Sequence, residues 1–96
     1  MSRYTVIVTT PAVADLQALR SYIAADNDRV AAHVAKALIE AMTSLETLPN
    51  RGRPGRSANT RELIVPGWPW IIVYEVAAER VTVLRVLHAA QKRPGA

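Results

Sequence analysis

Four polar side chains in the second half of the chain could together cleave RNA without a metal ion. Such cleavage needs a base for the 2′-hydroxyl group, an acid for the leaving oxygen and cations that stabilise the phosphate charge. Glu62 and His88 can transfer protons, and Arg61 and Arg85 can stabilise phosphate. A joint role therefore depends on whether the fold brings these four side chains to one place.

The strand that carries Arg85 and His88 is expected to separate these two side chains. If the hairpin before it is tight, Arg85 lies near Ile72 on the neighbouring strand, and alternation puts His88 on the other face with Leu84 and Val86. The two side chains then point to opposite faces, unless the strand ends before His88. A lone histidine at a strand end is also more often a hydrogen-bonded structural residue than a catalyst.

The densest basic cluster lies in residues 50–59, a loop rich in glycine, proline and arginine. It contains Arg51, Arg53 and Arg56, and Arg61 follows just beyond it. Guanidinium groups pair with carboxylate and phosphate in a forked geometry, and the glycines permit close approach of the backbone. We interpret this cluster as an edge that binds an anion or an acidic partner. A solvated loop is the alternative interpretation.

Two tryptophans flank Pro69 at a predicted hairpin turn. Trp68 and Trp70 either cap the edge of a sheet or contact a partner, since tryptophan is common at interface anchors. His33 lies beside the apolar stripe of a predicted helix, without a second ligand at metal spacing. The sequence therefore predicts neither a metal site nor a cofactor.

Two helical patterns follow a short strand at residues 3–9. Apolar residues recur at three- and four-residue spacing over residues 11–25 and again from about residue 28 to residue 48. The turn-forming residues Asp26, Asn27 and Asp28 separate the two patterns, and Pro49 is predicted to end the second. We expect a helical hairpin with one shared apolar side.

After residue 59 the apolar pattern changes to that of strands. Residues 60–65, 70–76 and 81–87 predict a three-stranded antiparallel meander. The last two strands are apolar on both faces, which is typical of the middle of a sheet. Residues 1–96 therefore predict a single α+β domain of two layers, with the hairpin on one sheet face and the other face open.

Composition narrows the class of protein further. The first 48 residues carry four basic and five acidic side chains, and the last 48 carry eight basic and three acidic ones, so the halves have net charges of −1 and +5. A basic half suits an acidic protein or a polyanion. The absence of cysteine excludes disulfides and thiol nucleophiles. Without a leader pattern or about 18 consecutive apolar residues, we expect a cytoplasmic protein that does not enter the membrane.

Five short segments recur in the order and at the intervals of a known family. They are Ala14–Leu16, Leu45–Gly55, Thr60–Leu63, Ile71–Tyr74 and Val83–Gln91. In these segments the chain resembles the ParE branch of the RelE/ParE superfamily, the toxins of type II toxin–antitoxin systems. The resemblance covers nearly the whole chain and implies the RelE/ParE-like fold.

The resemblance also implies two alternative targets. ParE-like members bind DNA gyrase and poison it, whereas RelE-like members cut messenger RNA on the ribosome, and both are held inactive in a complex with an antitoxin. RelE-like ribonucleases carry additional lysines and a tyrosine near the C-terminus, but this chain has only Lys36 and Lys92, and no aromatic residue after Tyr74.

We therefore expect an inhibitor of gyrase that acts by binding and is neutralised by an acidic antitoxin. The first alternative is a metal-independent endoribonuclease that uses Arg61, Arg85 and His88. The second is an inactive protein that only binds its antitoxin. The residues expected to contact the target or the antitoxin are Arg51, Arg53, Arg56, Arg61, Trp68, Arg85, His88, Lys92 and Arg93.

Overall fold

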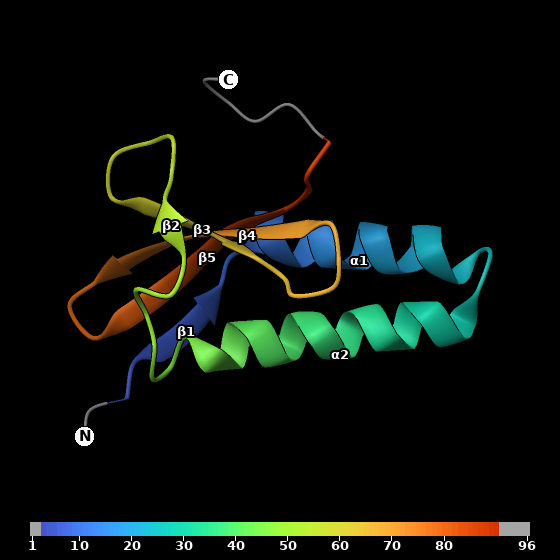
Figure 1. Cartoon of the computed structure of the whole chain (residues 1–96), viewed down its shortest axis with the longest axis horizontal. Helices are drawn as coiled ribbons and strands as arrows, with labels where there is room; N and C mark the ends of the chain where they lie inside the picture. The colour runs from blue at the N-terminus through green and yellow to red at the C-terminus, as the bar shows by residue number, and fades with distance from the viewer. Residues whose placement is uncertain (1–2, 91–96) are drawn as a thin grey trace.

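A computed structural model describes residues 3–90, in which two helices lie side by side, joined by a short turn (Figure 1). The elements are β1 (Thr5–Val8), α1 (Thr10–Ala24), α2 (Asp28–Ser44), β2 (Arg53–Pro54), β3 (Thr60–Ile64), β4 (Trp70–Ala77) and β5 (Arg80–His88). The predicted α+β fold, with its helical hairpin and its meander, is confirmed. No helix in residues 3–90 has the length and apolar character required to cross a bilayer.

The strands form one sheet in the order β1-β5-β4-β3-β2. Strands β3, β4 and β5 are the predicted antiparallel meander, and β4 and β5 lie inside the sheet, as their apolar faces predicted. Strand β1 pairs with β5 in parallel, with Val8 opposite Val83. The first and last strands of the chain are therefore neighbours.

The core lies between the hairpin and one face of the sheet. Helix α2 supplies Leu38, and Leu45 follows just after the helix; the sheet supplies Ile72 and Tyr74, and all four are at most 2% exposed. Tyr74 is thus part of the core.

Side chains cap the start of both helices. The Thr9 hydroxyl accepts a hydrogen bond from the Ala12 amide and donates one to the Val83 carbonyl oxygen at 2.8 Å. Asn27 Oδ1 accepts from the amides of Arg29 and Val30 at 3.0 and 3.1 Å. These caps satisfy amides that have no partner within the helix. Thr9 also attaches the start of α1 to the edge of β5.

The prediction that α2 continues to Pro49 is wrong. The helix ends at Ser44, and the chain tightens into turns in which the Leu45 amide donates to the Met42 carbonyl oxygen. The Glu46 carbonyl oxygen accepts from the Tyr4 amide at 2.8 Å, so this stretch also holds the chain just before β1. Leu48, the last residue of the predicted stripe, is 58% exposed.

Two local features of the sheet were not predicted. Residues 50–59 are not wholly a loop, because Arg53 and Pro54 form the edge strand β2 opposite Glu62 and Arg61. Strand β5 contains a bulge, since Tyr74 pairs with Val83 but Val73 pairs with Arg85. The bulge makes Val73, rather than the predicted Ile72, the partner of Arg85.

Candidate functional site

Arg85 is held by a carboxylate on α1. Its Nε donates to Asp15 Oδ2 at 2.7 Å, and its Nη2 donates to Asp15 Oδ1 at 3.0 Å. Asp15 Oδ2 also accepts from the Val86 amide at 2.9 Å. Strand β1 pairs with β5 only as far as Val83, so Asp15 supplies an acceptor to the edge of β5 beyond the end of β1.

Ionisation of Asp15 is favoured by this arrangement. Burial by itself raises the pKa of the carboxyl group, but the hydrogen bonds from Arg85 and the Val86 amide, together with the charge of Arg85, lower the pKa below its ordinary value. Asp15 therefore stays charged, and the forked geometry fixes the guanidinium of Arg85. The sequence contained no signal that paired Asp15 with Arg85.

His88 lies on the side of the sheet that faces α1. Its Nδ1 accepts a hydrogen bond from the Ala90 amide at 3.0 Å, so in this arrangement Nδ1 carries no proton. Its ring meets Trp70 edge to face, with the ring centroids 5.0 Å apart. The ring also lines a shallow groove with Asp15 and Tyr22.

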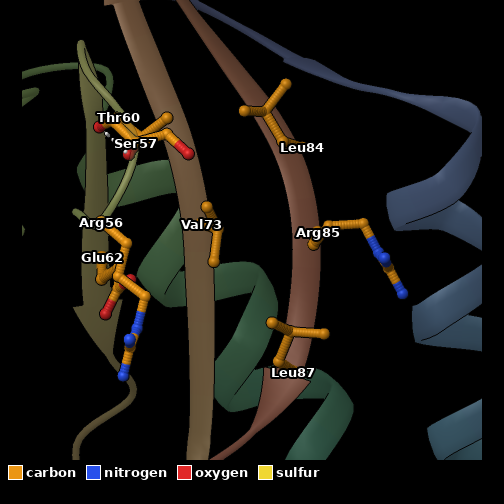
Figure 2. Close-up of a pocket in the computed structure, with 8 residues that line it drawn as sticks. All are labelled: Arg56, Ser57, Thr60, Glu62, Val73, Leu84, Arg85 and Leu87. Atoms are coloured by element: carbon orange, nitrogen blue, oxygen red, sulfur yellow. Dashed lines mark hydrogen bonds between the residues drawn. The ribbon is translucent and has the colours of Figure 1, made fainter. Parts of the chain in front are cut away.

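A pocket of about 130 Å³ lies on the other face of the sheet (Figure 2). Its lining residues are Arg56, Ser57, Thr60, Glu62, Val73, Leu84, Arg85 and Leu87. Figure 2 shows the guanidinium of Arg85 directed away from this pocket toward α1. Arg85 and His88 therefore leave β5 on opposite faces, as strand alternation suggested. The bulge places Leu84 beside the pocket, so the prediction that Leu84 shares the face of His88 is wrong.

Glu62 is the buried acid of this pocket. Its side chain is 5% exposed, and its Oε1 lies 3.5 Å from Nη2 of Arg53 on β2. Arg61, the next residue back along β3, faces the other way and donates from Nη1 to the carbonyl oxygen of Gly52 at 2.7 Å. Arg61 and Glu62 therefore do not pair with each other.

Tyr74 holds the same loop from within the core. Its hydroxyl donates to the Pro49 carbonyl oxygen and accepts from the Gly52 amide, both at 2.8 Å. Burial raises the pKa of this hydroxyl, an effect only partly offset by the Gly52 amide and the charges of Arg61 and Arg51. The hydroxyl therefore remains a donor at neutral pH. The sequence contained no signal for this polar role of Tyr74.

The predicted contact residues that the structure describes do not form one cluster. Arg53 and Arg56 border the open sheet face, and Arg61 binds the backbone of the loop at Gly52. His88 lies on the face of the sheet that α1 covers. Trp68 is half-buried and packs against the core. Lys92 and Arg93 lie outside the described residues. Within residues 3–90, no group of three or more histidine, aspartate or glutamate side chains could hold a metal ion.

Comparison with known proteins identifies the family of this chain. Residues 6–93 match the family described as ParE toxin of type II toxin-antitoxin system, parDE. The chain belongs to the ParE toxin family. It is therefore the toxin of a type II toxin–antitoxin system, and an antitoxin is its partner.

Two relatives of this ParE-family toxin match over almost their full length. Toxin Y4kP of Sinorhizobium fredii, a putative toxin by name, is 37% identical over 94 residues, which cover 98% of this chain and 97% of that protein. Toxin RelE2 of Caulobacter vibrioides is 41% identical over 86 residues, which cover 90% of this chain and 96% of that protein. One of the two relatives is thus named for the RelE branch of the superfamily.

Two solved structures share the fold of this ParE-family toxin. A structure of the chromosomal ParDE toxin–antitoxin system from P. aeruginosa matches with a TM-score of 0.80 at 24% identity, covering 90% of this chain and 96% of that one. The RelBE2 toxin–antitoxin complex from Mycobacterium tuberculosis matches with a TM-score of 0.62 at 27% identity, covering 95% and 97%. Both come from toxin–antitoxin systems.

Proposed function

We propose that this toxin inhibits DNA gyrase by binding to it, without itself catalysing bond cleavage, and that an acidic antitoxin neutralises it. One observation carries the proposal: the guanidinium groups of Arg61 and Arg85 are each already bound within the fold, and Arg85 and His88 leave opposite faces of β5. Arg61 donates to the loop backbone, Arg85 is paired with Asp15, and His88 lies on the other side of the sheet from the pocket that Arg85 lines. If gyrase is the target, the toxin acts in the cytoplasm.

Cleavage of RNA requires these groups to act on one phosphodiester. A general acid or base must come within about 3 Å of the proton it transfers, either directly or through one water molecule. Arg85 and His88 leave opposite faces of β5, and the guanidinium of Arg85 is already engaged by a carboxylate at 2.7 Å. This arrangement favours a protein that binds its target over one that cleaves it.

The charge of the molecule supports an acidic partner. The last 48 residues have a net charge of +5, and Arg51, Arg53 and Arg56 are exposed in and beside the edge strand β2. Complementary charge raises association rates and suppresses wrong partners. An acidic antitoxin and an acidic surface of gyrase would both suit this edge.

A second function, ribosome-dependent cleavage of messenger RNA, is favoured by the relatives. One relative is named toxin RelE2, and one structural match is a RelBE2 complex. In that case Arg61, Arg85 and His88 are the candidate catalytic residues, and Asp15 would have to release Arg85 when RNA binds.

Purified toxin, added to gyrase with ATP and relaxed plasmid DNA, tests the proposal. We expect loss of supercoiling or accumulation of linear DNA, and we expect the antitoxin to restore activity. Full supercoiling at excess toxin would contradict the proposal. In parallel, programmed ribosomes would yield cut transcripts if the second function is correct. Inactivity in both assays, with tight antitoxin binding, would identify a toxin fold that has lost its activity.

A further inference from the structure

Tyr74 on β4 and Arg61 on β3 lie side by side in the sheet and together hold the chain that follows α2. They are register partners in the sheet. The Tyr74 hydroxyl bonds to the Pro49 carbonyl oxygen and the Gly52 amide, each at 2.8 Å. Arg61 Nη1 donates to the carbonyl oxygens of Gly52 and Asn50, at 2.7 and 3.4 Å. Two strand side chains therefore hold the backbone between Pro49 and Gly52.

The fit at Gly52 leaves no space for a side chain. A Cβ atom there would lie 2.7 Å from Tyr74 Oη and 2.9 Å from the Glu62 carbonyl oxygen. Gly52 is buried, and Tyr74 is 0% exposed. The backbone at Gly52 therefore contacts the hydroxyl directly, and the position of the loop depends on that contact.

Further bonds hold the rest of this arginine loop, which we define as residues 50–59. Arg51 Nη1 donates to Ser44 Oγ at 2.8 Å at the end of α2. The Gly55 amide donates to the Thr60 carbonyl oxygen at 2.7 Å, and Thr60 Oγ1 donates to the Ser57 carbonyl oxygen at 2.7 Å. The loop is thus tied to the domain at its start and at its end.

We propose that Tyr74 and Arg61 are positioning residues that set the shape of the arginine loop, through which Arg51, Arg53 and Arg56 contact an acidic partner. The proposal rests on the proposed function in taking gyrase as one such partner, with the antitoxin as the other. It changes the role of Arg61, whose guanidinium serves the loop backbone instead of the partner. A loop that is already ordered loses less entropy on binding, so its arginines bind more tightly.

The substitution Tyr74→Phe tests this inference cleanly, because it alters neither the charge nor any exposed atom. It removes the hydroxyl that holds Pro49 and Gly52 and keeps the ring in the core. We expect the Gly52 amide to exchange with deuterium at least about tenfold faster, and binding to gyrase or antitoxin to weaken about tenfold. Ile72→Val is the matched control, since it also truncates a buried residue of β4 but removes no hydrogen bond to the loop.

A second measurement separates positioning from a general loss of stability. Tyr74→Phe is introduced into a variant in which Arg51, Arg53 and Arg56 are all glutamine. If the tyrosine acts through these arginines, its removal costs no further affinity there, as a double-mutant cycle would reveal. The same loss in both backgrounds, or binding by Tyr74→Phe equal to that of Ile72→Val, would overturn the inference.

Failure of the proposed function gives a different result. In that case the unmodified toxin neither binds nor inhibits gyrase. The positioning role is then tested by the rate at which the Gly52 amide exchanges with deuterium and by the affinity of the toxin for the antitoxin. Unchanged values for both in Tyr74→Phe would refute the positioning role whatever the target is.

Discussion

Asp15 and Arg85 lie 70 residues apart in the chain and form a two-pronged ion pair, with Nε–Oδ2 at 2.7 Å and Nη2–Oδ1 at 3.0 Å. The Asp15 side chain is 17% exposed and the Arg85 side chain 46%. The same carboxylate accepts the Val86 amide. One acidic side chain on α1 therefore attaches the helical hairpin to β5 and determines where Arg85 points.

Removal of the Asp15 carboxylate should destabilise the toxin. In Asp15→Ala the partly buried Val86 amide loses its acceptor, which costs about 1–3 kcal/mol of unfolding free energy. For a domain of this size the Tm should fall by at least about 4 °C, as measured by circular dichroism. Glu40→Ala, an exposed change on α2, is the control. Equal Tm values for the two variants would contradict the structural role of Asp15.

Low pH should remove the contribution of Asp15 to the free energy of unfolding. Because the folded-state pKa of Asp15 is lowered, its charge stabilises the fold above the ordinary carboxyl pKa of about 3.9, and this stability is lost as the pH falls through the folded-state value. The unfolding free energies of the wild type and of Asp15→Asn in urea should therefore differ at pH 7 and converge below about pH 4. A difference in unfolding free energy that stays constant with pH would indicate that the charge of Asp15 does not stabilise the fold.

Gly52 should not tolerate even one methyl group. In Gly52→Ala the new Cβ meets Tyr74 Oη at 2.7 Å and the Glu62 carbonyl oxygen at 2.9 Å, so the loop must shift at a cost of about 1–3 kcal/mol. Gly67→Asn is the contrast. Gly67 has a φ of 82°, which asparagine accepts more readily than most residues, and a Cβ there would have no other atom within 4 Å. Urea denaturation should rank Gly52→Ala as the less stable variant.

Loss of proton transfer at His88 should leave toxicity largely intact. In His88→Asn the amide oxygen can replace Nδ1 as the acceptor for the Ala90 amide, but it cannot act as an acid or base. A catalytic acid or base contributes about 10²–10⁴-fold to a rate. Growth inhibition in cells, at matched expression, should fall by far less than that. A loss of that size, with antitoxin binding retained, would instead support the ribonuclease.

Much of this fold could be predicted because its elements are encoded locally. The three- and four-residue spacing of apolar side chains marks α1 and α2, and the β-branched runs mark β3, β4 and β5. The predictions of secondary structure were wrong where residues that are distant in the sequence bind each other. The chain turns after Ser44 and binds the Tyr4 amide through Glu46, and β2 forms because Arg53 lies opposite Glu62 of β3.

The candidate site was less predictable than the fold. Residue order was enough to show which side chains are available: the arginines of residues 50–59, the opposite directions of Arg85 and His88, and the resemblance to the toxin family. The partners became apparent only in the folded chain, where Asp15 binds Arg85 and the backbone of Pro49 and Gly52 binds Tyr74. The physical reason is that periodicity reports the face on which a side chain lies, whereas a hydrogen bond depends on a second group whose position comes from the packing of the whole chain.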